Sequence, residues 1–210
     1  MPLKRRHKYV LTALAFYWPA IFVATHIPMP SDIGKAGMSD KTMHFLAYLA
    51  LVSLAWLSVS HFEKVNWSKP KVWVILAAVV WYGAMDEWLQ GFVGRTPDPM
   101  DFYFDVAASI TALLIFTIFT FWPGVLVLAS IAIFSITCLT RVNIVFLNEL
   151  INSAFYFLAY SFFTLVWIQC TEKFLMIKNS QIKWLASALF VPFAALAVMS
   201  LSAKYIFDKQ

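Results

Sequence analysis

Long apolar blocks alternate with short polar connectors along the whole chain. Each block holds about 17–25 residues, the length that a helix needs to cross about 30 Å of hydrocarbon. The blocks lack the apolar–polar alternation of transmembrane β-strands. The pattern therefore predicts an all-α fold, a polytopic transmembrane helical bundle of about seven spans. The expected spans are 9–25, 42–60, 72–92, 102–121, 125–139, 144–170 and 184–207.

Local signals predict where some of these spans begin. Ser39 or Asp40 is a candidate N-cap for the second span. Pro99 suits the opening turn of the fourth span, and Trp122-Pro123-Gly124 is typical of a tight turn before the fifth. We expect two domains: a four-helix membrane domain, 1–122, and a three-helix C-terminal membrane extension, 123–210.

Composition supports the membrane interpretation and excludes other classes. Hydrophobic residues make up 61% of the chain and charged residues 13%, against about 45–50% and 25% in soluble domains. The net charge of +5 comes from short basic clusters between apolar blocks, which are typical of topology signals rather than of nucleic-acid binding. The 2 cysteines lie inside apolar blocks, so neither a disulfide framework nor a thiolate metal site is expected.

The distribution of Lys and Arg predicts the orientation. If the N-terminus is cytoplasmic, ten of the 16 basic residues fall on the cytoplasmic side and six outside. The positive-inside rule therefore favours a cytoplasmic N-terminus in a multi-pass protein of the cell membrane.

One stretch, 81–105, interrupts this apolar chain with charge, since it holds five of the 11 acidic residues. Ionisable groups at or near bilayer depth are costly and are usually retained for function. With the N-terminus inside, the start of span two, the end of span three and the start of span four meet at the extracytoplasmic leaflet. We therefore expect one outward-facing site built from Asp40, Lys41, His44, Asp86, Glu87, Gln90, Arg95, Asp98, Asp101 and Asp105.

Spacing within the spans indicates which side chains share a helix face. Lys41 and His44 are separated by three residues, and Asp40 and His44 by four. Glu87 and Gln90 pair in the same way on span three. Of the two adjacent acids there, Asp86 is the one more readily explained as merely solvated.

The polar connector before span four carries its own candidates. Arg95 suits bidentate pairing with Glu87 or Asp101, or a clamp on a phosphate or carboxylate. Asp98 is most simply a turn residue. Asp101 and Asp105 lie one turn apart in the first turns of span four, where one of them is a candidate cap and the helix dipole favours anions.

These motifs together resemble one known family. Asp40-Lys41-x-x-His44-x-x-x-Tyr48, Gly83-x-x-x-Glu87-x-x-Gln90, and Arg95 with Asp101 are similar to the VanZ-like membrane proteins, named after an accessory protein linked to teicoplanin resistance. The resemblance covers about residues 9–121 and implies a role in the cell envelope. The chain departs from the family at Asp105, where Asn is frequent, and at Ala107-Ala108, where Gly follows.

Two classes of function remain open. The first is an enzyme acting on a lipid-linked or phosphate-bearing envelope substrate, with Glu87 or Asp101 as base and His44 as acid. The anionic or polar parts of the substrate would then be bound by Lys41, Gln90, Arg95 and Asp105.

Cofactors cannot be assigned from the sequence. The carboxylates at 87, 101 and 105 with His44 would suit a hard divalent ion, Mg²⁺ or Mn²⁺, better than zinc. The second class of function is non-catalytic: a lipid-binding or antibiotic-binding protein, or a transporter gate. Membrane lipids, including a lipid-linked envelope precursor, are the expected partners in either case.

Overall fold

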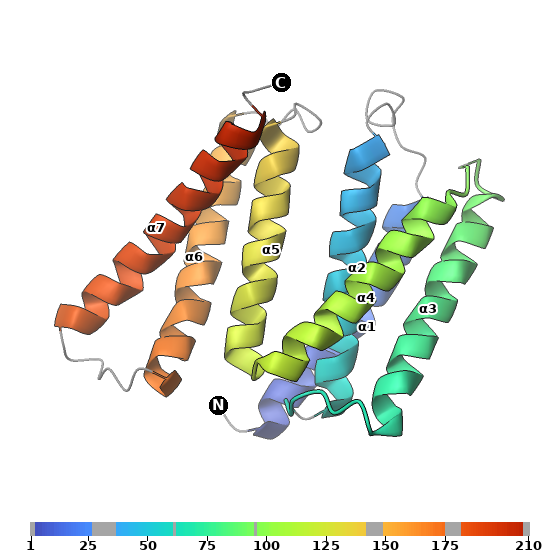
Figure 1. The fold of residues 1–210 in the computed structure, drawn as a ribbon, viewed down its shortest axis with the longest axis horizontal. Helices are drawn as coiled ribbons and strands as arrows, with labels where there is room; N and C mark the ends of the chain where they lie inside the picture. The colour runs from blue at the N-terminus through green and yellow to red at the C-terminus, as the bar shows by residue number, and fades with distance from the viewer. Residues whose placement is uncertain are drawn as a thin grey trace. The chain divides into compact units, whose positions relative to one another are not determined.

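The computed structural model describes residues 3–26, 37–60, 62–94, 96–141, 149–174 and 182–207. Within these ranges the chain forms seven α-helices and no strand, and each helix is long and apolar enough to cross a membrane. The predicted all-α, multi-pass architecture is confirmed. The helices are α1 (Leu3–His26), α2 (Gly37–Ser60), α3 (Pro70–Gln90), α4 (Pro99–Ile118), α5 (Phe121–Arg141), α6 (Glu149–Phe174) and α7 (Ile182–Phe207) (Figure 1).

The chain divides into two compact units, Met1–Phe121 and Trp122–Gln210. In the first unit, α2 packs against α1, α3 and α4, and its contact with α4 is the most extensive. α2 buries Leu51, Val52 and Trp56 completely, and α4 buries the small residues Ala108 and Ala112. Small residues one turn apart let helix backbones approach each other within a bilayer.

The four helices of this unit alternate in direction, so one end of each lies at the same end of the unit. α1 ends, α2 begins, α3 ends and α4 begins at the same end of the unit (Figure 1). At the opposite end, the connection between α2 and α3 is fixed to the last turn of α4. Val65 N donates to the Phe116 carbonyl at 2.9 Å, and Trp67 Nε1 donates to Thr117 Oγ1 at 2.9 Å.

Local chemistry explains where α4 begins. Asp98 has an extended backbone, and its side chain accepts a hydrogen bond from Met100 N at 2.9 Å, which makes Asp98 the N-cap. Pro99 occupies the first helical position, as predicted, where its missing N–H is not needed. Neither Asp101 nor Asp105 is the cap.

Two predicted helix starts are wrong. α2 begins at Gly37, so Asp40 lies in the first turn instead of at the N-cap. An acidic side chain in the first turn still interacts favourably with the helix dipole. α5 begins at Phe121, so Trp122-Pro123-Gly124 forms its first turn. Proline is accommodated there because the first N–H groups of a helix have no partner within it. The break lies instead at Phe119, which has an extended backbone.

The second unit has a small apolar core of its own. Ile133 of α5 and Ala159 and Phe163 of α6 are buried, with Leu196 and Met199 of α7 packed against them. The predicted sixth span began at residue 144, and 144–148 lie outside the described residues. Many large apolar side chains in both units are exposed, as expected of surfaces that face lipid.

Candidate functional site

Side chains from α2, α3 and α4 form a buried polar cluster where those helix ends meet. His44 of α2, Glu87 of α3, and Asp101 and Asp105 of α4 are only 3%, 7%, 3% and 1% exposed. We call these four residues the central cluster. Its position confirms that the charged positions of three spans converge, which the topology had predicted.

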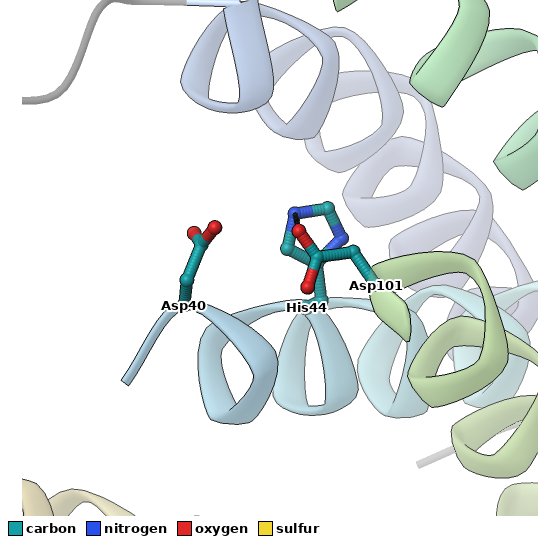
Figure 2. Close-up of side chains that lie close together, drawn as sticks. All are labelled: Asp40, His44 and Asp101. Atoms are coloured by element: carbon teal, nitrogen blue, oxygen red, sulfur yellow. Dashed lines mark ion pairs between the residues drawn. The ribbon is translucent and has the colours of Figure 1, made fainter. Parts of the chain in front are cut away.

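His44 lies between two carboxylates. Its Nδ1 is 3.2 Å from Asp105 Oδ1, and its Nε2 is 3.8 Å from Asp101 Oδ2. Figure 2 shows Asp101 reaching from α4 across the imidazole of His44, with Asp40 one turn earlier on α2. An imidazole held between two carboxylates has a defined orientation and suits proton transfer or metal ligation.

Lys41 joins α2 to the start of α4. Its Nζ donates to Asp98 Oδ2 at 2.7 Å and to Asp101 Oδ1 at 3.3 Å. The hydrogen bond from the ammonium group lowers the pKa of Asp98, which precedes the span. Because two carboxylates engage Lys41 already, an anionic ligand would have to compete with them. The role of Lys41 in substrate binding stays a prediction.

Two carboxylate oxygens in the central cluster have no hydrogen-bond partner among the residues that the structure describes. Glu87 Oε2 accepts from Asp98 N at 3.0 Å, whereas the buried Glu87 Oε1 accepts nothing. Asp105 Oδ2 is likewise buried and without a partner there. Buried polar atoms are nearly always paired, so these two oxygens are the candidate ligand atoms of the cluster.

Gly83 allows the cluster to close on its inner side. A Cβ at this position would lie 3.3 Å from Asp105 Oδ2 and 3.4 Å from the ring of Tyr48. Tyr48 is fully buried and stacks on Tyr82 with ring centroids 6.0 Å apart. The glycine thus allows α3 to approach α2 and α4 closely at this point.

A second polar network lies beside the cluster and corrects one prediction. Asp86 is 1% exposed, not solvated. Its two oxygens accept hydrogen bonds from Thr25 Oγ1 at 2.9 Å and from Gln90 Nε2 at 3.1 Å, and His26 Nδ1 lies 3.6 Å away. The end of α1 covers this face of α3, so the carboxylate is removed from solvent. Gln90 is therefore bound to Asp86 within the protein, and its assignment to substrate binding remains untested.

Sequence reasoning did not include Thr25 and His26 in the site. Both are polar residues at the end of α1, and the cytoplasmic N-terminus predicted above would place that end beside Asp86. That signal was present in the sequence. Arg95, in contrast, lies outside the described residues, so its predicted pairing cannot be located.

A groove between α3 and α4 lies beside the cluster. Its volume is about 570 Å³, and Glu87 forms part of its wall. The remaining lining is largely apolar and includes Trp88, Phe92, Pro97 and Phe102. Glu87 thus belongs both to the buried cluster and to an apolar surface groove.

Two overlapping sets of residues have the spacing of metal ligands: Asp40, His44 and Asp101, and His44, Glu87 and Asp105. In each set the ligand atoms lie within 4.8 Å of one another. The arrangement therefore allows proton transfer at His44, cation binding, or both.

Comparison with known proteins identified no relative of this chain. No protein-family model matches the chain, and neither a curated protein nor a solved structure matches it.

Proposed function

We propose that this multi-pass protein is a VanZ-like component of the cell envelope that acts on the polar head of a lipid-linked substrate at the extracytoplasmic leaflet. The family assignment rests on residues and not on a match to a family model. Its support is that Lys41, His44, Glu87 and Asp101, which carry the resemblance, come from three helices and lie together.

One observation carries the choice of a lipid-linked substrate: Glu87 lies in the central cluster and also lines the apolar groove between α3 and α4. A groove with aromatic and proline walls on a membrane-facing surface suits an acyl or prenyl chain. A chain lying there would bring the attached head group to Glu87. A soluble substrate would have no need of the apolar wall.

The cluster suggests how the head group would be processed. Glu87 is the candidate base. Its Oε1 has no partner within the described part of the chain, whereas its Oε2 accepts a hydrogen bond from Asp98 N. His44, oriented by Asp101 and Asp105, is the candidate acid. Arg95 remains the candidate for binding an anionic oxygen, because the ammonium of Lys41 is already paired.

The test is a comparison of envelope lipids by mass spectrometry. Cells would lack the protein or express, at matched levels, wild type, Glu87→Gln or the control Glu63→Gln. Glu63 follows α2 at the opposite end of the unit, and its side chain is 62% exposed. The proposal predicts a covalently altered lipid with wild type and with Glu63→Gln, absent with Glu87→Gln, together with higher teicoplanin tolerance in the same two strains.

The same experiment separates the alternatives. Identical lipids in all strains would overturn the enzyme and favour a protein that binds or moves a lipid or antibiotic. An altered lipid that persists with Glu87→Gln would remove Glu87 from the chemistry and with it the observation on which the proposal rests.

A further inference from the structure

Three buried side chains from three different helices can reach a common point in the central cluster. His44, Glu87 and Asp105 each offer one ligand atom, and these atoms lie within 4.8 Å of one another. They are 3%, 7% and 1% exposed. Acidic clusters alone do not define a metal site. The evidence for a bound ion here is that two oxygens of these residues have no hydrogen-bond partner in the described part of the chain.

The unused atoms are Glu87 Oε1 and Asp105 Oδ2. Both are buried, and neither has a hydrogen-bond partner among the residues described. An unsatisfied buried acceptor is costly, and an ionised one more so. The other oxygen of each carboxylate is already in contact with the protein: Glu87 Oε2 with Asp98 N, and Asp105 Oδ1 with His44 Nδ1. A bound cation would satisfy the two remaining oxygens.

Charge leads to the same position. The carboxylates of Asp86, Glu87, Asp101 and Asp105 are all buried in the first unit. Lys41 bonds to Asp101 and Asp98 only, so that among the described residues Asp105 has His44 as its one basic neighbour and Glu87 has no ion pair. Buried charges persist only when they are paired or coordinate a metal. A divalent ion between Glu87 and Asp105 would neutralise both.

The contacts of His44 fit ligation through Nδ1. An ion bound to Nδ1 would replace the contact of 3.2 Å between Nδ1 and Asp105 Oδ1. This separation is close to the distance of about 3.1 Å between two ligands at right angles on a six-coordinate ion with bonds of about 2.2 Å. The opposite ring nitrogen, Nε2, is 3.8 Å from Asp101 Oδ2. A carboxylate behind a ligating histidine orients the ring and makes it a stronger donor.

The outer set of residues is a poorer candidate. It consists of Asp40, His44 and Asp101 (Figure 2). The Lys41 ammonium lies 3.3 Å from Asp101 Oδ1 and would repel a second cation there. Asp40 is also only half-buried, whereas all three inner residues are buried.

We propose that His44 Nδ1, Glu87 and Asp105 bind one divalent transition-metal ion, with Asp101 orienting His44 from behind. One imidazole and two carboxylates, completed by water, form a mixed donor set that Mn²⁺ accepts in octahedral geometry. If the ion is bound, Glu87 and His44 serve as its ligands rather than as base and acid, and the ion would hold an anionic oxygen of the substrate in their place; this use rests on the proposed function. Binding of the ion does not.

The test measures binding of Mn²⁺ to the full chain purified in detergent. Equilibrium dialysis against Mn²⁺ gives the dissociation constant, and electron paramagnetic resonance reports the bound fraction. We expect one Mn²⁺ per chain in wild type, at least tenfold weaker binding in Asp105→Asn and in Glu87→Gln, and a change of less than twofold in the matched control Asp40→Asn. Helical circular dichroism and gel filtration establish that each variant is folded.

The contrary results are equally definite. Absence of stoichiometric Mn²⁺ in wild type would overturn the inference, as would binding that survives both inner substitutions or is lost in Asp40→Asn. If Asp105→Asn does not fold, Glu87→Gln, which keeps the side-chain shape, decides alone.

Metal binding and lipid chemistry can fail separately. Mn²⁺ bound by the inner residues without any altered lipid in cells would leave this site in place and remove the proposed function. Lipid conversion by protein that binds no Mn²⁺ would do the reverse.

Discussion

Replacing Lys41 with Met tests how the start of α2 is held to the start of α4. The substitution removes the ammonium but keeps most of the apolar stem. It leaves Asp101, whose side chain is 4% exposed, without the charge that lies 3.3 Å from its Oδ1. Asp98 loses the same partner, but its side chain is 41% exposed. The two acids should therefore respond very differently.

The expected loss of stability follows from burial. Removing one partner of a fully buried ion pair costs about 3–5 kcal/mol. Lys41 is 22% exposed and His44 remains 3.8 Å from Asp101, so we expect a loss of about 2 kcal/mol for Lys41→Met. The exposed pair with Asp98 contributes less than about 1 kcal/mol. Asp98→Asn should cost no more than that, since Asn also caps a helix.

The assay is unfolding of the purified protein in mixed micelles with increasing sodium dodecyl sulfate, followed by tryptophan fluorescence. The decisive variant is the double substitution Lys41→Met/Asp101→Asn. It removes the buried charge together with its partner and should recover most of the stability lost in Lys41→Met. The ion pair does not hold these helices together if Lys41→Met costs no more stability than Asp98→Asn. The same conclusion follows if the double variant loses as much stability as Lys41→Met and Asp101→Asn lose together as single substitutions.

Two other predictions use the same assay. Thr25→Val should cost about 1 kcal/mol of stability, because hydrogen bonds in membrane proteins average about 0.6 and reach about 1.7 kcal/mol. The Thr25 hydroxyl lies near both Asp86 Oδ1 and the Phe22 carbonyl. An equal cost of Thr25→Val in an Asp86→Ala background would show that the bond to Asp86 contributes nothing. The folded protein lowers the pKa of Asp98, so the stability that this acid contributes is present above its unfolded pKa of about 3.9 and is lost as the pH falls through the lower folded value. The stability difference between wild type and Asp98→Asn should consequently disappear in acid, and a difference that grows on acidification would contradict this assignment.

The seven helices could be predicted because apolar length is a strong signal. Their ends could not be predicted equally well, because caps and first turns depend on a few local bonds. Pro99 was placed correctly, since Asp98 before it can cap the helix. Trp122-Pro123-Gly124 predicts a turn, although proline is as compatible with a helical first turn as with a loop. Hydropathy does not distinguish these two uses.

The convergence of charged positions from three spans was also predictable, because helix direction alone brings those ends together. The environment of each carboxylate was not. Asp86 and Glu87 are neighbours in sequence, yet Asp86 bonds to Thr25 of α1 whereas Glu87 bonds to the backbone of Asp98. That difference depends on the rotation of α3 and on how α1 covers it, and neither can be read from spacing within a single helix.

The two sides of the central cluster differ, because one is closely packed and the other borders an apolar groove. On the inner side, a methyl group at Gly83 would lie 3.3 Å from Asp105 Oδ2, so this carboxylate would have to shift slightly. Glycine costs about 1 kcal/mol relative to alanine within a helix, so close approach, and not helix propensity, accounts for it. On the other side, Glu87 opens onto the apolar groove between α3 and α4. A ligand that reached the cluster through this groove would pass apolar side chains such as Trp88 and Phe92 before it met a charged group. An amphiphile can follow that route. Its chain would stay in apolar surroundings while its head group comes into contact with carboxylates, an imidazole or a bound cation.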